Sequence, residues 1–287
     1  MLAGILSTTV VLPFALGVAL GVVSLRPTWR NAIMPLLFIL FALVVLLVLE
    51  GIPTFHSLGM KQKLPLIIVA IGLVATIGLA ANGRWRTSAA WLISGIAAIG
   101  VAWLGQNIIF SSPVKVALAL FGALAAPVLA SFPSATQAKS GRPAEIGLLA
   151  AAFSSVLALS LAAAFGAFLG AAQLNGAMAA LLGAASLVLL IAHAMGNDAA
   201  FGFDRLTRVV FAAIAAQFIA VAILLTPKLS LAGAALAILC WLVPLGVARF
   251  ANGLDRFGRL SRFLAVAILT FLPAAASIAM SAFAAFH

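Results

Sequence analysis

The sequence contains very few charged residues. Only 7% of its 287 residues are charged, namely sixteen Lys or Arg and five Asp or Glu, whereas 66% are hydrophobic. Water-soluble globular chains carry about 25% charged residues, so this composition excludes that class. The long uncharged runs instead indicate a chain that lies in a lipid bilayer.

Cysteine, histidine and buried lysine are also too scarce for most cofactor chemistry. The single cysteine, Cys240, excludes a disulfide framework within the chain and a cysteine-based zinc or iron–sulfur site. The three histidines are scattered, and all five lysines fall in predicted loops. No motif of a metalloprotease or a serine hydrolase occurs. We therefore expect no cofactor, no metal and no enzymatic activity.

The spacing of the charges predicts ten membrane spans. The uncharged runs between charges are each at least 19 residues long, and one run of 52 residues, 146–197, has room for two spans. A helix needs about 20 apolar residues to cross the hydrocarbon core. The predicted spans are 4–24, 33–50, 65–82, 88–106, 114–131, 146–170, 175–195, 207–226, 229–248 and 262–284. We expect an all-α, polytopic membrane helix bundle forming a single transmembrane domain, 1–287.

The basic residues divide unequally between the two sides of the predicted bundle. Alternate loops place all eleven arginines and Lys139 on one side, and the other four lysines on the opposite side. The positive-inside rule assigns the arginine side to the cytoplasm, so both termini are predicted to lie outside the cytoplasm. We expect a multi-pass protein of the cell inner (plasma) membrane. Topology also accounts for the net charge of +11, which removes the argument for a nucleic-acid partner.

The most polar loop, 132–145, divides the chain into halves 1–131 and 146–287 with five spans each. Two halves with an odd number of spans cross the membrane in opposite orientations, as inverted repeats do in many transporters. The first span of each half carries a Gly-x-x-x-Gly pattern, Gly17 with Gly21 and Gly166 with Gly170, which favours close helix contact. Tight packing without duplication is the alternative interpretation.

A short charged motif occurs twice near the carboxyl end. Segments 202–208 and 253–259 share Gly-[Phe/Leu]-Asp-Arg-[Leu/Phe]-x-Arg, each just before a span on the arginine side. Each aspartate is placed to cap the following helix, and ordinary helix entry is the simpler interpretation. The second segment resembles the cytoplasmic Asp-Arg-x-Gly-Arg loop of major facilitator carriers, which implies a charge latch between helices. The candidate cytoplasmic latch residues are Asp204, Arg205, Arg208, Asp255, Arg256 and Arg259.

Few polar side chains are predicted at membrane depth. Gln217 lies in the middle of the eighth span, where its amide needs a partner on another helix or on a ligand. Gln106 and Asn107 end the fourth span, and His193 and Asp198 flank the end of the seventh. A histidine near a carboxylate suggests a proton or ion relay, although a solvated histidine is the simpler alternative. These five residues are the candidates for a substrate path.

Two functions fit these observations. The first is a permease or flippase that moves a neutral, amphipathic or zwitterionic small molecule or lipid-linked substrate by alternating access. Such a substrate is expected because no buried counter-charge is predicted for a strong ion. The second is a non-catalytic membrane subunit or assembly factor whose Ala- and Gly-rich helices pack against partner membrane proteins. In either case membrane lipids surround the chain.

Overall fold

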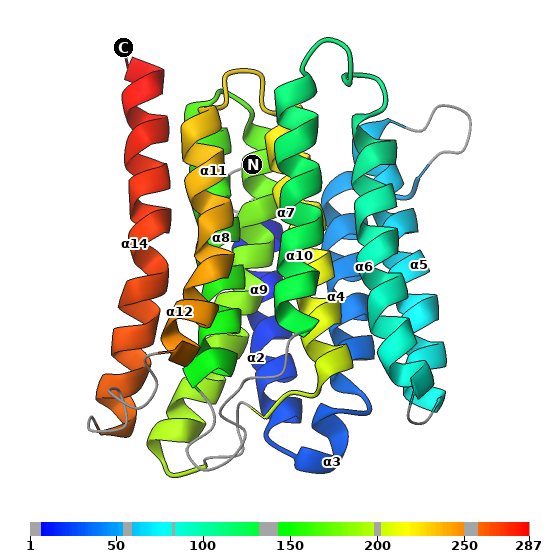
Figure 1. Cartoon of the computed structure of the whole chain (residues 1–287), viewed down its shortest axis with the longest axis vertical. Coiled ribbons are helices and arrows are strands. Elements are labelled where there is room, and N and C mark those ends of the chain that lie inside the picture. The colour runs from blue at the N-terminus through cyan, green and yellow to red at the C-terminus, as the bar shows by residue number, and fades with distance from the viewer. Residues whose placement is uncertain are drawn as a thin grey trace.

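The computed structural model describes residues 7–53, 59–81, 84–131, 143–197, 202–249 and 258–286. These residues form helices and no strand (Figure 1). In chain order the elements are η1 (Ser7–Val11), α2 (Leu12–Ser24), α3 (Pro27–Arg30), α4 (Met34–Glu50), α5 (Met60–Ala80), α6 (Arg84–Gly105), α7 (Pro113–Ser131), α8 (Pro143–Phe165), α9 (Leu169–Ala194), α10 (Arg205–Leu225), α11 (Leu231–Leu239), η2 (Cys240–Leu242), α12 (Val243–Arg249) and α14 (Arg259–Phe286). The predicted polytopic helical bundle is confirmed.

The ten predicted spans correspond to ten apolar rods in the described part of the chain. Eight of them are long and apolar enough to cross a membrane. The other two are shorter: α4, and the broken rod formed by α11, η2 and the first residues of α12. The 17 residues of α4 rise about 26 Å, slightly less than the roughly 30 Å of a bilayer core. The break at Cys240–Leu242 ends two residues before Pro244, which cannot supply a helical N–H.

Successive rods run in opposite directions, so the connecting segments alternate between two ends of the bundle (Figure 1). Every arginine whose backbone the structure describes lies at the lower end in Figure 1, which we call the arginine end. Lys61, Lys63, Lys115 and Lys228 lie at the upper end, the lysine end. The arrangement agrees with the separation of arginines from lysines that the sequence predicts, and the assignment of the arginine end to the cytoplasm stays a prediction.

Several helix boundaries differ from those predicted. α5 begins at Met60, so Lys61 and Lys63 lie in its first turn, and Lys115 lies in the first turn of α7. The prediction that all lysines fall in loops was therefore wrong for these three, and for Lys115 it also conflicted with the predicted span 114–131, which contains that residue. The reason is that a long lysine side chain can extend along its helix toward the interface while its backbone remains helical.

The sixth span also ends earlier than predicted. α8 stops at Phe165, and α9 begins at Leu169. Ala167 adopts φ 60° in the connecting turn, and the N–H of Phe168 donates to the carbonyl of Ala163 at 2.9 Å. This is the Schellman pattern that ends many helices, with alanine in the left-handed position where glycine is usual. The second Gly-x-x-x-Gly pattern consequently crosses a turn and lies on no single helix face.

The first Gly-x-x-x-Gly pattern does bring two helices together. A Cβ atom built on Gly17 would lie 2.2 Å from the carbonyl oxygen of Leu181, and one on Gly21 would lie 2.7 Å from Cβ of Val188. Both neighbours belong to α9, so α2 approaches the backbone of α9 where no side chain intervenes. The contact joins the two predicted halves, and their relation as inverted repeats stays a prediction.

Helix α10 forms the centre of the bundle. Its residues from Leu206 to Leu224 are buried, and it packs against six helices, α4 to α9. By contrast, α14 lies at one edge, where it contacts mainly α8 and α11 (Figure 1). The polar groups at the beginning of α10 are therefore positioned by helices that surround it on all sides.

Candidate functional site

The first residue of interest is Asp204, which caps α10 at the arginine end. Its backbone is extended, and its Oδ1 accepts a hydrogen bond from the backbone N–H of Thr207 at 2.9 Å. This bond satisfies one of the free N–H groups in the first helical turn, and the carboxylate also complements the positive end of the helix dipole. The capping role predicted for Asp204 is confirmed.

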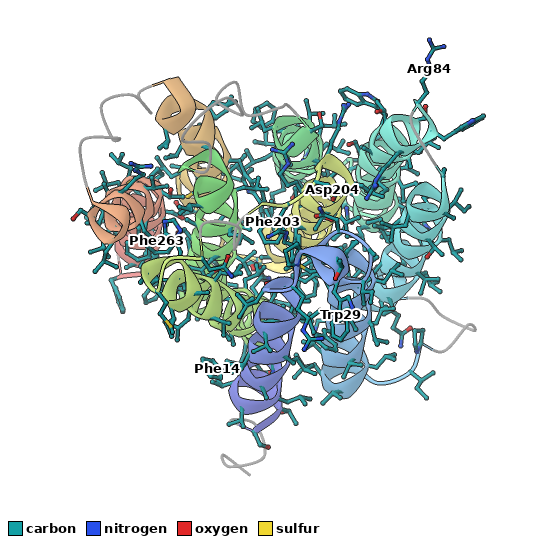
Figure 2. All side chains as sticks on the ribbon, turned by 90° about the horizontal axis from the view of Figure 1, so that it is seen from below. Phe14, Trp29, Arg84, Phe203, Asp204 and Phe263 are labelled. Carbon is teal, nitrogen blue, oxygen red and sulfur yellow. The ribbon has the colours of Figure 1, made fainter. Side chains whose placement is uncertain are left out.

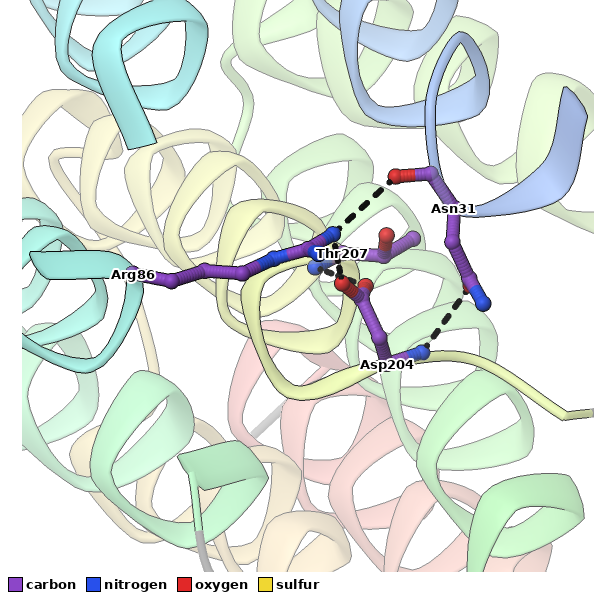
Figure 3. Close-up of polar contacts among 4 residues, drawn as sticks. All are labelled: Asn31, Arg86, Asp204 and Thr207. Atoms are coloured by element: carbon purple, nitrogen blue, oxygen red, sulfur yellow. Dashed lines mark hydrogen bonds and ion pairs between the residues drawn. The ribbon is translucent and has the colours of Figure 1, made fainter. Parts of the chain in front are cut away.

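The other oxygen of Asp204 forms an ion pair with a residue that sequence reasoning did not select. Arg86, in the first turn of α6, donates from Nη2 to Oδ2 of Asp204. The same Nη2 donates to the backbone carbonyl of Asn31 at 3.3 Å, and Oδ1 of Asn31 accepts from the backbone N–H of Asp204 at 3.2 Å. Figure 3 shows these contacts, which join α6, α10 and the turn between α3 and α4. We call the three residues Asn31, Arg86 and Asp204 the latch.

The latch lies between solvent and the bundle interior. The side chain of Arg86 is 38% exposed and that of Asp204 is 21% exposed. Viewed from the arginine end, Asp204 lies toward the middle of the bundle, whereas Arg84 projects from its edge (Figure 2). Ion pairs that keep this much contact with water contribute about 1 kcal/mol or less. The latch can therefore hold the three segments together and still be broken at low cost.

Two hollows flank the latch. One, of about 300 Å³, is lined by Arg86, Thr87, Asp204, Arg205 and Leu206. The second, of about 470 Å³, lies toward α4 and α5 and is lined by Arg86 together with Thr28, Asn31, Ala32, Leu36, Thr76, Leu79 and Ala80. Arg86 lines both hollows. A ligand entering either hollow would therefore meet a latch residue directly.

The other predicted latch residues do not all join this cluster. The guanidinium carbon of Arg205 lies 5.3 Å from the ring centroid of Trp91, a cation–π contact with α6. Arg208 is buried one turn further along α10. Asp255 and Arg256 lie outside the described residues, as does the side chain of Arg259. A latch between the two Gly-[Phe/Leu]-Asp-Arg motifs accordingly stays a prediction.

The predicted substrate-path residues lie at separate levels of the bundle. Gln217 is fully buried on α10, and its Nε2 donates to the carbonyl of Ala97 on α6 at 2.9 Å. Its Oε1 has no hydrogen-bond partner among the described residues. Gln217 thus links α10 to α6 through Nε2, while a ligand contact, the other role that the sequence left open, stays a prediction. It lines neither hollow at the latch.

The remaining path candidates occupy the two ends. Gln106 and Asn107 are exposed in the turn that follows α6 at the lysine end. His193 is buried in the last turn of α9 at the arginine end, and Asp198 lies outside the described residues. The structure therefore does not bring these candidates together around one site.

Asn175 is a buried polar residue that sequence reasoning missed. Its Nδ2 donates to the carbonyls of Ala171 and Phe218, each at 3.1 Å, and so links α9 to α10. The predicted seventh span began at residue 175, which placed this side chain at the membrane surface. Because α9 begins at Leu169, Asn175 is instead fully inside the bundle. An amide within an uncharged run, in a chain with so few polar groups, was the available signal.

At the lysine end of the bundle, lysines form the cross-links between helices. Nζ of Lys63 donates to the carbonyl of Trp103 at 3.0 Å, which joins α5 to α6. Nζ of Lys115 donates to the carbonyl of Thr226 at 2.6 Å and to that of Pro227 at 3.1 Å, which joins α7 to the end of α10. Lys61 and Glu50 form an ion pair of 2.7 Å between α5 and α4. Polar cross-links thus occur at both ends.

An apolar groove of about 440 Å³ lies between α8, α9 and α14. It is lined mainly by Leu, Ile, Phe and Ala, with Ser154 and Ser186 as the hydroxyl-bearing members. Leu187 and Ile268 on its rim are exposed side chains of membrane-spanning helices. The groove therefore faces the surroundings of the bundle, where the hydrocarbon of the membrane would lie.

The fold, the hydropathy of its rods and the polar cross-links at both ends define a multi-pass helical membrane protein. Comparison of the chain with protein-family models, with curated proteins and with solved structures found no match. The function proposed below therefore depends on the residues and contacts described above.

Proposed function

We propose that the protein is an inner-membrane permease or flippase. It moves a neutral, amphipathic or zwitterionic small molecule or lipid-linked substrate by alternating access and carries out no covalent chemistry. The latch at the arginine end is the observation that carries the proposal. Asn31, Arg86 and Asp204 join three separate segments through contacts that are partly exposed and flanked by hollows.

Alternating access requires that each end of a bundle can close while the other opens. In this chain the partly exposed cross-links lie at the ends, whereas the middle of the bundle is packed mainly with apolar side chains and holds the buried amide links of Asn175 and Gln217. Breaking a partly exposed ion pair costs about 1 kcal/mol or less. Separating a buried apolar interface costs far more, because roughly 25 cal/mol is lost for each Å² exposed to water. The ends are thus the parts of the bundle that open most readily.

A substrate without strong net charge suits the bundle interior. The buried polar groups inside the bundle include the amides Asn175 and Gln217 and the hydroxyl of Ser160, which donates to the carbonyl of Ala172 at 2.7 Å. Groups of this kind can bind a dipole or a hydroxyl but cannot balance a full charge. The groove between α8, α9 and α14 would give the apolar tail of an amphipathic substrate a lateral place to lie.

Reconstitution tests the proposal. Liposomes containing the purified protein, loaded with neutral and zwitterionic solutes or with fluorescent lipid analogues, are assayed for counterflow or flipping against protein-free liposomes. We expect flux above the protein-free control. We expect Arg86→Gln to reduce it roughly fivefold, the effect of about 1 kcal/mol on a two-state balance. The matched control is Arg84→Gln, which removes a charge from the same helical turn without touching the latch.

The second candidate function is a non-catalytic subunit or assembly factor. The apolar groove between α8, α9 and α14 favours this function, since a helix of a partner membrane protein would fit against α9 and α14. In that case reconstituted protein gives no flux with any of these substrates, and it co-purifies stably with a membrane complex. This pair of results would contradict the transport proposal.

A further inference from the structure

The smaller hollow beside the latch brings two cations and one anion around a single space. Its lining residues include Arg86 and Arg205, which carry the cations, and Asp204, which carries the anion. Arg205 is held there by its contact with Trp91, and Asp204 by its cap on α10. The volume of about 300 Å³ is at the small end of the range for ligand sites.

Both arginines at this hollow carry an unused donor. The Nε atom of Arg86 and the Nε atom of Arg205 are buried and have no hydrogen-bond partner among the described residues. A buried donor without an acceptor is costly, and guanidinium groups bind carboxylate or phosphate oxygens in paired hydrogen bonds. Because Arg86 and Arg205 both line the hollow, an anionic group placed there would lie beside two cations.

An anion alone does not match the site, because Asp204 would be left beside it. Asp204 is about four-fifths buried, and Arg86 is the cation that balances its charge. A ligand that takes Arg86 leaves this carboxylate unpaired unless the ligand also supplies a cation. A cation alone would instead face two arginines. A molecule with an anionic group and an ammonium group a few bonds apart satisfies all three residues.

We propose that this hollow binds a small zwitterion that takes the place of the latch ion pair. The carboxylate or phosphate of the ligand contacts Arg86 and Arg205, and its ammonium contacts Asp204. Binding replaces the direct bond between α6 and α10 with a bond from each helix to the ligand, so at the latch the two helices are then joined only through the ligand and separate there when it leaves. This inference rests on the proposed function and specifies its substrate class. Free amino acids and the phosphoethanolamine headgroup of a lipid share the required chemistry.

Binding to the whole 287-residue chain tests the inference independently of flux. The protein is placed in nanodiscs of phosphatidylglycerol, whose headgroup has no ammonium, and titrated with O-phosphoethanolamine and with glycine. Inorganic phosphate and ethanolamine, which supply one charge each, are titrated in parallel. We expect at least one zwitterion to bind about tenfold more tightly than either single-charge probe. Arg86→Gln and Asp204→Asn should each weaken that binding about tenfold, and Arg84→Gln should not change it.

A second arm separates the two sources of the zwitterion. Adding phosphatidylethanolamine to the nanodiscs weakens the apparent affinity for the soluble zwitterion if the lipid headgroup is the ligand, and leaves it unchanged if the ligand is a free solute. Equal binding of phosphate alone, unchanged binding in both latch variants, or no binding of any probe would overturn the inference. None of these results would remove flux of a neutral substrate, so the proposed function is tested separately.

Discussion

Asp204 has two interactions that different substitutions can separate. The carboxylate caps α10 through Thr207 and pairs with Arg86. Asparagine caps a helix about as well as aspartate but carries no charge, whereas alanine neither caps the helix nor carries a charge. We expect Asp204→Ala to lower the free energy of unfolding by about 1 kcal/mol more than Asp204→Asn does. Unfolding of both variants in detergent, followed by circular dichroism, measures the difference.

Equal destabilisation by the two substitutions would contradict the cap and assign the whole effect to the ion pair. The expected difference depends only on the loss of a local hydrogen bond, so it is independent of the proposed function.

At the residue scale, the sequence predicted one partner of the latch and missed the other two. Asp204 stood out because an aspartate before an apolar run is a typical helix cap. Arg86 was counted with the other arginines as a topology signal, and Asn31 was not considered. Which of many basic residues meets a given aspartate depends on how α6 and α10 pack, and a contact between residues 118 positions apart leaves no local pattern.

At the scale of the element, the contact between α2 and α9 depends on glycine at one position. The Cβ of an alanine at Gly17 would lie 2.2 Å from the carbonyl oxygen of Leu181, and backbone atoms cannot move aside cheaply. We expect Gly17→Ala to lower the free energy of unfolding by roughly 1–3 kcal/mol through overpacking. Thermal or detergent-induced unfolding of the purified variant measures the loss.

Gly95 supplies the matched control for that measurement. It lies within α6 with open space where its Cβ would be, so Gly95→Ala should be neutral or stabilising by up to about 1 kcal/mol. If both substitutions change stability by the same amount, the close approach of α2 to α9 is contradicted and glycine acts only through helix propensity.

Helix number could be predicted from the sequence, but some helix ends could not. The length of an uncharged run shows whether it can cross the bilayer, so the number and approximate positions of the apolar rods can be predicted. The end of α8 depends on a turn with Ala167 in a left-handed conformation, where a search for glycine selects the wrong residue. Gly166 is needed for a different reason, since a Cβ there would lie 2.3 Å from Cγ2 of Thr226.

At the scale of the whole molecule, the position of each rod in the bundle could not be predicted. α10 and α14 have nearly the same mean hydropathy, yet α10 is almost wholly buried and α14 is mostly exposed. Lipid tails are as apolar as a leucine-rich interior, so hydropathy does not distinguish a central membrane helix from a peripheral one. The separation of arginines from lysines was predictable, because topology constrains charge directly.

The account as a whole requires that the arginine end faces the cytoplasm and the lysine end faces outside. Single cysteines introduced at Arg84 and Gly258 probe the first end, and cysteines at Phe110 and Lys228 probe the second. The background is Cys240→Ala, which removes the only native thiol, a buried one. In intact cells treated with a membrane-impermeant maleimide, we predict labelling at positions 110 and 228, and labelling at positions 84 and 258 only after the membrane is opened. Labelling of 84 and 258 from opposite sides would contradict the bundle, the latch and the proposed transport together.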